Sequence, residues 1–239
     1  MPNHFFRFKQ FNINQDKCAM KVCTDACLFG AWLSNYIQQK NIQINKVLDI
    51  GTGTGLLSLI MAQHLQASFD AIEIDEFAAS QAKENFEASP WAAQYNVINE
   101  DIKNWKSVTK YDLIISNPPF FENDLRSYDN ARNLALHHDG LRLEILLEIV
   151  KNKLRDNGNF AVLIPYKRRE YFLSLLQKNK FYLEEEVQIK QTEKHNPFRL
   201  IFIISKTESV TNKTEIYIKE EGKYSYQFTS LLQNYYLNL

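Results

Sequence analysis

The chain has 239 residues, of which 45% are hydrophobic, and its 28 basic side chains balance its 28 acidic ones. This size fits one domain with additions, and a net charge of zero provides no overall attraction to nucleic acid. No apolar run approaches the ~20 residues that span a bilayer, and the first residues lack a signal-peptide pattern. We therefore expect a cytoplasmic protein without a membrane partner, and we favour a monomer.

The chain alternates between strands and helices after a first helix, which is predicted over residues 25–36 from its apolar spacing. Strands are predicted over residues 46–50, 69–74, 95–98, 111–116, 160–164, 184–190, 200–206 and 215–219. Helices are predicted over 56–65, 76–86, 141–154 and 224–236. This alternation indicates an α/β fold with a mostly parallel sheet and helices on both faces. We divide it into an N-terminal segment (1–40), a main domain (41–207) and a C-terminal strand–helix extension of the same domain (208–239).

A glycine-rich loop follows the predicted strand 46–50. It places a glycine at every second position, in the order Gly51, Thr52, Gly53, Thr54, Gly55. Glycine permits a tight turn and close approach of a ligand to the backbone. A dinucleotide-binding fingerprint would need glycine where Leu56 stands, and a P-loop would need a lysine that is absent here. Asp49 would repel a pyrophosphate, and it suits a cationic ligand such as the ammonium of a methionyl group.

Acidic residues also stand at the ends of the next two predicted strands. Glu73 is placed to accept hydrogen bonds from ribose hydroxyls, as acidic residues do in other nucleotide-binding sheets. Asp101 is placed to accept a hydrogen bond from an adenine amine. The alternative for such acids is capping of a loop or helix, to which Asp75 and Asp101 are suited. Because ligands bind at the carboxyl ends of parallel strands, these positions predict one shared site.

Asn117-Pro118-Pro119-Phe120 directly follows the predicted strand 111–116. The exocyclic amine of adenine is a poor nucleophile because its lone pair is shared with the ring. An Asn oxygen and a backbone carbonyl, both fixed at a strand end, can accept the two amine hydrogens and free that lone pair. The prolines stiffen the turn, and the aromatic ring offers a stacking surface. The four residues are therefore candidate catalytic residues for methyl transfer to a planar amino nitrogen.

These motifs together resemble the class I S-adenosylmethionine-dependent methyltransferases. More narrowly, the whole chain resembles the bacterial tRNA1(Val) adenosine-37 N6-methyltransferases, mainly through residues 8–11 and 16–25 ahead of the glycine loop. The chain departs from that family's usual pattern at Cys23 and Ala26, where glycine is common, and at Phe120, where tyrosine is usual. The resemblance implies a Rossmann-like, mostly parallel seven-stranded sheet with a C-terminal antiparallel strand.

The resemblance also implies the methyl donor, the substrate and the residues that bind them. The donor would be S-adenosyl-L-methionine, and the substrate would be adenosine 37 in the anticodon loop of a valine tRNA. A splayed loop adenine costs less to expose than a paired one. The expected cofactor-binding residues are Lys17, Thr24, Asp25, Asp49, Gly51, Thr52, Gly53, Gly55, Glu73, Ile74, Asp101, Ile102 and Asn117.

Positive charge gathers between residues 163 and 206, where nine Lys and Arg face five Glu. We interpret part of it as RNA phosphate contacts, although a solvated helix start explains residues 167–169 equally well. The RNA-contact candidates are Arg126, Lys167, Arg168, Arg169, Lys194, His195 and Arg199. In the polar loop 122–139, a possible lid, Arg132, His137 and His138 are further candidates, and ordinary surface polarity is the alternative for the histidines.

Three alternatives to this function stay open. The first is methylation of another amino group, such as guanine N2 or adenine N6 in ribosomal RNA, or the N5 amide of a protein glutamine. The second is a non-catalytic S-adenosylmethionine-binding protein, and the third is a Rossmann oxidoreductase, which Leu56 disfavours. No metal is expected, because Cys18, Cys23 and Cys27 lack zinc-ligand spacing and are interpreted as buried free thiols.

Overall fold

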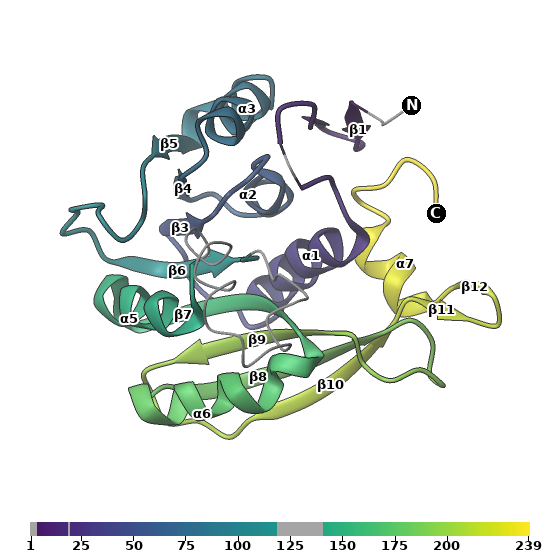
Figure 1. Cartoon of the computed structure of the whole chain (residues 1–239). Helices are drawn as coiled ribbons and strands as arrows, with labels where there is room; N and C mark the ends of the chain where they lie inside the picture. The colour runs from purple at the N-terminus through teal and green to yellow at the C-terminus, as the bar shows by residue number, and fades with distance from the viewer. Residues whose placement is uncertain (1–3, 19, 119–140) are drawn as a thin grey trace, which may run out of the picture.

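The computed structural model describes residues 4–18, 20–118 and 141–239. Within them, one sheet of eight strands runs through the molecule in the order β10-β8-β9-β7-β6-β3-β4-β5 (Figure 1). Its strands are β3 (Lys46–Ile50), β4 (Ser68–Glu73), β5 (Tyr95–Asn99), β6 (Tyr111–Ser116), β7 (Leu154–Pro165), β8 (Tyr182–Lys190), β9 (Arg199–Ser205) and β10 (Asn212–Tyr217). The expected α/β class is confirmed. The resemblance implied seven strands, and the eighth strand of this sheet, β10, overlaps the strand predicted over residues 215–219.

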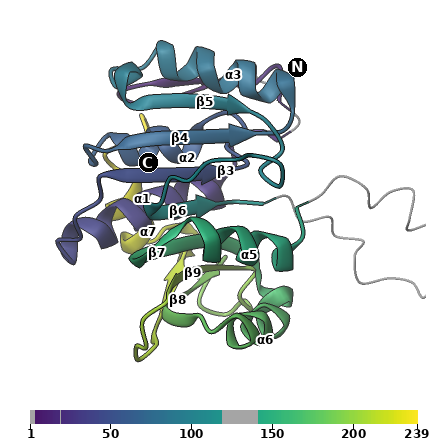
Figure 2. The ribbon, with the colours of Figure 1, turned by 90° about the vertical axis from the view of Figure 1, so that its left-hand side faces the viewer.

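Helices cover both faces of this sheet, as Figures 1 and 2 show. One face packs against α1 (Thr24–Gln39), α2 (Leu56–Ala62), α3 (Glu76–Glu87) and α7 (Tyr226–Leu232). The other packs against α5 (Leu143–Lys153) and α6 (Arg169–Asn179). Two hydrophobic clusters result, one on each side. The central strands β3 and β6 are almost wholly buried, as expected of parallel strands between two helical layers.

The register of the central strands sets which residues meet at the carboxyl edge. Ile50 of β3 pairs with Ser116 of β6, and the Ser116 hydroxyl donates to the Ile50 carbonyl oxygen at 2.8 Å. The residues that follow these two strand ends are Gly51 and Asn117. Since β4 flanks β3 on its other side, this is the point where successive connections turn in opposite directions, the usual position of a ligand site in such sheets.

Strand β9 runs antiparallel to both of its neighbours, β7 and β8, and no other strand of the described sheet does so. Its first residue, Arg199, pairs with Pro165, the last residue of β7. The beginning of β9 therefore lies at the same edge as the ends of β6 and β7. The 3-10 turn η3 (Tyr166–Arg168) lies there too, because it follows β7 directly and the Tyr166 N–H donates to the Phe198 carbonyl.

The N-terminal segment lies on the face that carries α3 and α7. Strands β1 (Phe5–Arg7) and β2 (Asn12–Asn14) form a small hairpin, and Phe8 forms an isolated bridge with Tyr236 near the other end of the chain. A second small hairpin joins β11 (Lys219–Glu220) to β12 (Lys223–Tyr224), and the 3-10 turn η1 (Ala92–Gln94) precedes β5. Through the bridge between Phe8 and Tyr236, the N-terminal segment is held against the rest of the domain.

Candidate active site at the carboxyl edge of the sheet

The glycine loop adopts a conformation that only glycine takes without strain. Gly51, Gly53 and Gly55 have φ angles of +71°, +57° and +82°, the left-handed region that disfavours side chains. Among the described residues, nothing lies within 4 Å of a Cβ added at Gly51 or Gly53, whereas a Cβ at Gly55 would lie 2.5 Å from the Phe86 ring. Gly55 therefore serves packing, and Gly51 and Gly53 present bare backbone to open space.

Asp49 lies beneath this loop and is fully buried. Its Oδ2 accepts hydrogen bonds from the Thr52 hydroxyl at 2.8 Å and the Ser58 hydroxyl at 2.7 Å. Its Oδ1 has no hydrogen-bond partner among the described residues. Burial, opposed by the two hydroxyls and assisted by the charge of Glu73, raises the pKa of Asp49 to about 6. The carboxylate thus holds the loop through Oδ2, while Oδ1 makes no hydrogen bond within the described residues.

Glu73, the last residue of β4, also binds the loop directly. Its Oε2 accepts from the Gly53 N–H at 2.9 Å and its Oε1 from the Asp75 N–H at 3.1 Å. Beside it, Ile74 is 56% exposed, an unusual position for a large apolar side chain. Asp75 caps α3 by accepting from Ala78 N–H, as the capping alternative predicted.

Asp101 and Ile102 follow β5 and complete the expected cofactor side. Asp101 is half-buried, accepts from the Lys103 N–H at 3.0 Å and forms an ion pair with Lys103 Nζ at 3.1 Å. Ile102 is buried and belongs to the cluster beneath α5 and α6. Asp101 therefore organises a local turn in this structure, and Ile102 packs in the core.

These features fit an adenosyl ligand whose amino-acid end carries an ammonium group. Bare backbone at Gly51 and Gly53 leaves room for close approach, the exposed Ile74 offers an apolar surface for a flat base, and Glu73 is a carboxylate at the strand end. The unpartnered Oδ1 of Asp49 adds negative charge below the loop. None of these residues is a cation that could balance the negative charge of a pyrophosphate.

Asn117 and Pro118 stand at the end of β6, next to the glycine loop. Asn117 is half-buried and Pro118 is buried. Pro119 and Phe120 lie outside the described residues, as do the loop candidates Arg126, Arg132, His137 and His138. The structure therefore places the first half of the proposed catalytic turn.

The start of α1 lies at the same edge. Arg199 Nε donates to Asp25 Oδ2 at 2.8 Å, so an expected cofactor residue and an expected RNA contact bind each other. Thr24 is the first residue of the helix and is exposed. Cys23, its N-cap, has an extended backbone with φ −127°, which explains why a residue other than glycine is accommodated there.

Lys17 of the N-terminal segment packs against α3. Its Nζ forms an ion pair with Glu84 Oε1 at 2.5 Å, and its backbone N–H donates to Gln81 Oε1 at 2.8 Å. The hydrogen bond to Glu84 raises the pKa of Lys17. Its ammonium is therefore engaged by the helix beneath it, and its contribution to the edge comes through the position of the N-terminal segment.

Arg169 binds a buried carboxylate. Its guanidinium donates two hydrogen bonds to Glu186, from Nε at 2.8 Å and from Nη2 at 2.7 Å, and the Glu186 side chain is fully buried. A third bond goes to Glu170. Arg169 is thus engaged in an ion pair with a buried carboxylate, and its contact with RNA stays a prediction. Lys167 and Lys194 are exposed, and Arg168 is half-buried. The exposed His195 bonds to the Thr192 hydroxyl at 2.7 Å.

Sequence reasoning missed a set of amide side chains behind the site. Asn85 and Gln81 of α3 are buried, and both bind the N-terminal segment. Gln15 of that segment is buried as well, and its Oε1 accepts from Val22 N–H. The available signal was a polar Asn85 on the apolar face of α3, three residues after the buried Ala82.

The cysteines differ in their exposure. Cys18 and Cys27 are buried and free as expected, but Cys23 is exposed. No cluster of metal-ligating side chains occurs among the described residues, and no described helix is long and apolar enough to cross a bilayer.

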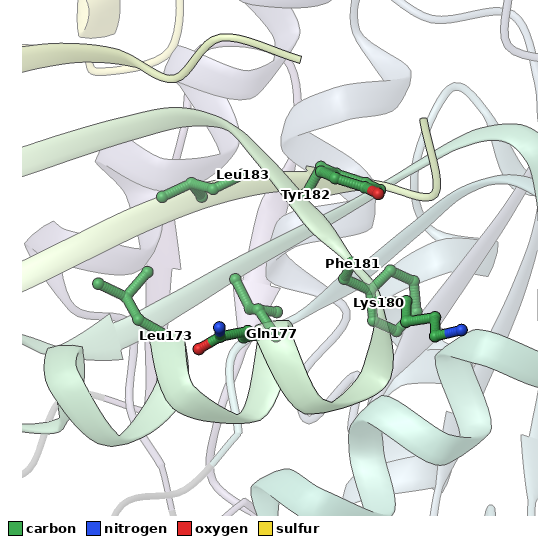
Figure 3. Close-up of a pocket in the computed structure, with 7 residues that line it drawn as sticks. Leu173, Gln177, Lys180, Phe181, Tyr182 and Leu183 are labelled. Carbon is green, nitrogen blue, oxygen red and sulfur yellow. The ribbon is translucent and has the colours of Figure 1, made fainter. Parts of the chain in front are cut away.

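A cavity of about 350 Å³ lies at the end of α6, at the opposite edge of the sheet (Figure 3). It is lined by Leu173, Leu176, Gln177, Lys180, Phe181, Tyr182 and Leu183.

The strand order, the glycine loop and the polar strand ends define a class I methyltransferase. Residues 31–170 match the family model of the methyltransferase small domain. A predicted O-methyltransferase from Agrobacterium tumefaciens superposes with a TM-score of 0.67 at 15% identity, covering 90% of this chain and all of that one. A putative class I S-adenosylmethionine-dependent methyltransferase from Listeria monocytogenes superposes with a TM-score of 0.57 at 15% identity, covering 84% and 67%.

Relatives that match over the whole chain have a higher sequence identity than these solved structures. The chain is 37% identical to the tRNA1(Val) (adenine(37)-N6)-methyltransferase of Parabacteroides distasonis, covering all of both chains. It is 38% identical to the protein of the same name from Aliivibrio salmonicida, covering 99% of both. The chain belongs to the family of tRNA1(Val) (adenine(37)-N6)-methyltransferases. The expectation of an S-adenosyl-L-methionine-dependent methyltransferase is confirmed.

Proposed function

We propose that the chain methylates N6 of adenosine 37 in the anticodon loop of tRNA1(Val), the substrate named for its relatives. The observation that carries the proposal is the pairing of Ile50 with Ser116, which sets the glycine loop and Asn117 at adjacent strand ends. A methyl donor held by the loop and an amine held by Asn117 then meet at one edge. We place the enzyme in the cytoplasm as a monomer.

Asn117 and Pro118 supply the chemistry of the acceptor. The Asn117 side-chain oxygen and the Pro118 carbonyl oxygen accept the two amine hydrogens, which draws the nitrogen toward tetrahedral geometry and frees its lone pair. When bound, S-adenosyl-L-methionine supplies an electrophilic methyl group on a sulfonium. Orientation by these groups is worth up to roughly 7–11 kcal/mol of the barrier. Pro119 stiffens the turn and Phe120 stacks on the base in this proposal.

The cofactor is held by two groups of residues. Gly51, Thr52 and Gly53 offer backbone, with Asp49 below them and Gly55 fixing the loop on Phe86. Glu73 takes the ribose hydroxyls, Ile74 packs on the adenine, and Asp101 and Ile102 close that side. The N-terminal segment, residues 1–40, closes the other side through Thr24 and Asp25, and Lys17 anchors it to α3.

RNA binds the part of the edge built by η3 and the loop between β8 and β9. Lys167 and Arg168 lie directly after β7, and Lys194 and His195 lie in the loop. Tyr166 is 36% exposed beside them and offers an aromatic surface to an unpaired base. Arg126 stays a candidate in the loop after the catalytic turn, and Arg199 reaches RNA only if it leaves Asp25.

The deciding experiment is transfer of a tritiated methyl group to unmodified bulk tRNA, followed by nucleoside analysis. Label as N6-methyladenosine at position 37 of tRNA1(Val) supports the proposal. Asn117→Ala should abolish transfer and retain S-adenosyl-L-methionine binding. Label only on ribosomal RNA or on a protein glutamine would overturn the substrate, and undiminished transfer by Asn117→Ala would overturn the role of that residue.

A further inference from the structure

Asn85 joins two segments that are far apart in the chain. It lies in the third turn of α3 and is 1% exposed. Its Oδ1 accepts from the Asn14 N–H at 2.8 Å, and its Nδ2 donates to the Asn14 carbonyl at 2.9 Å and to the Thr54 carbonyl at 2.9 Å. Asn14 belongs to the N-terminal segment and Thr54 to the glycine loop.

The three bonds use both donors of the amide group and one of the two acceptor positions of its oxygen. An Asn side chain offers two N–H donors and one carbonyl oxygen, and here each donor has its own backbone carbonyl. With Asn14 the amide forms the reciprocal pair of bonds that a neighbouring strand would form. Because the group is buried, loss of one partner leaves another polar atom without water. The two segments therefore hold their positions together.

Residues around Asn85 extend this connection in both directions. Phe86, the next residue, fills the space beside Gly55. One turn earlier, Gln81 accepts from the Lys17 N–H at 2.8 Å. The buried Gln15 then accepts from the Val22 N–H at 2.7 Å, just before α1 begins. One face of α3 thus binds the glycine loop at Thr54 on one side and the N-terminal segment at Asn14 and Lys17 on the other.

We infer that Asn85 is a positioning residue that couples the N-terminal segment to the glycine loop, so that the two walls of the cofactor pocket form together. The inference rests on the proposed cofactor site. Asn85 acts through the backbone of Asn14 and Thr54. A consequence is that cofactor binding at the loop stabilises the backbone at Asn14 and Lys17, and loosening of that backbone weakens cofactor binding.

Two substitutions test the coupling. Asn85→Ala removes all three bonds, and Asn85→Asp keeps the acceptor but directs a carboxylate at the Thr54 and Asn14 carbonyls. Both should raise the Kd for S-adenosyl-L-methionine at least tenfold in calorimetric titration at a temperature where the variants are folded. The matched control is Asn179→Ala, which removes an amide bond to the Leu175 carbonyl at the far end of α6 and should leave Kd within twofold.

Hydrogen exchange of the unmodified protein keeps the test independent of the variants' folding. Saturating S-adenosyl-L-methionine should slow exchange of the Asn14 and Lys17 amides at least tenfold, because these donate to Asn85 and Gln81. Unchanged exchange, or a Kd within threefold of the parent in folded Asn85→Ala, overturns the coupling. Failure of the parent protein to bind S-adenosyl-L-methionine would instead overturn the cofactor site itself, and absence of tRNA methylation with tight binding would concern the substrate alone.

Discussion

Arg199 and Asp25 lie 174 positions apart in the chain, and Arg199 Nε donates to Asp25 Oδ2 at 2.8 Å. The bond joins the first residue of β9 to the first turn of α1. Both side chains are more than half-buried, with exposed fractions of 33% and 14%. The pair therefore holds the N-terminal helix at the edge where the glycine loop and Asn117 lie.

Loss of either partner should weaken that edge. Asp25→Asn and Arg199→Gln should each lower the free energy of unfolding by about 1–3 kcal/mol, since each leaves a partly buried group without its partner. Urea unfolding of the singles and the double variant gives a coupling energy, expected at roughly 0.5–3 kcal/mol for groups in contact. Strict additivity of the two effects would show that the bond does not contribute.

The glycines of the loop should separate folding from ligand binding. Gly55→Ala should destabilise strongly, because its Cβ would meet the Phe86 ring at 2.5 Å in a left-handed backbone. Gly53→Ala meets open space, so it should cost only about 1 kcal/mol of backbone strain while reducing S-adenosyl-L-methionine affinity. Thermal unfolding and calorimetry on both variants measure this. Equal stability losses, or unchanged affinity in Gly53→Ala, would contradict the assignment of the space above Gly53 to ligand.

Asp49 should make stability depend on pH. Burial raises its pKa from the ordinary 3.8 to about 6, so the folded protein holds the proton more tightly than the unfolded chain. Its contribution to stability is complete below pH 4 and is lost as pH rises through about 6. Asp49→Asn cannot lose a proton, and its oxygen still accepts from Thr52 and Ser58. Stability of the parent relative to this variant should therefore fall between pH 4 and pH 7 in urea titrations; a constant difference would contradict this.

Arg169 and Lys167 should behave oppositely although they are near neighbours. Arg169→Ala leaves Glu186 buried without its partner, so unfolding free energy should fall by about 3–5 kcal/mol. Burial tends to raise the Glu186 pKa, but the hydrogen bonds from Arg169 and Gln188 outweigh it and lower that pKa. Lys167→Ala removes an exposed charge and should reduce tRNA affinity and its salt dependence with little loss of stability. Filter binding at several salt concentrations and thermal unfolding decide between the roles.

The sheet was largely predictable because its central strands are apolar and end at unmistakable signals. Predicted bounds of 46–50 and 111–116 agree with β3 and β6, which stop at the glycine loop and at Asn117. The helix predicted over 56–65 ends at Ala62, where Gln63 begins a turn. A helix start was one interpretation of residues 167–169, but no bounds were predicted for the helix Arg169–Asn179 that follows.

The details of the site were less predictable because they depend on partners distant in sequence. Nothing near Arg169 reveals that Glu186 is buried beneath it, and nothing near Asp25 reveals Arg199. Likewise, Asn85 is recognisable as important only when Asn14 and Thr54 are seen on either side of it. Local pattern predicts which strand ends carry polar residues, and tertiary contacts decide what each one binds.

The reversed direction of β9 has a consequence for how this family can diversify. Its preceding loop opens at the same edge as the catalytic turn, yet β9 pairs only with β7 and β8. Insertions or deletions between Lys190 and Arg199 would therefore reshape the rim without moving β3, β4 or the glycine loop. In the proposed arrangement, in which this rim contacts RNA, such loop changes would alter the acceptor contacts and leave the donor-binding strands in place.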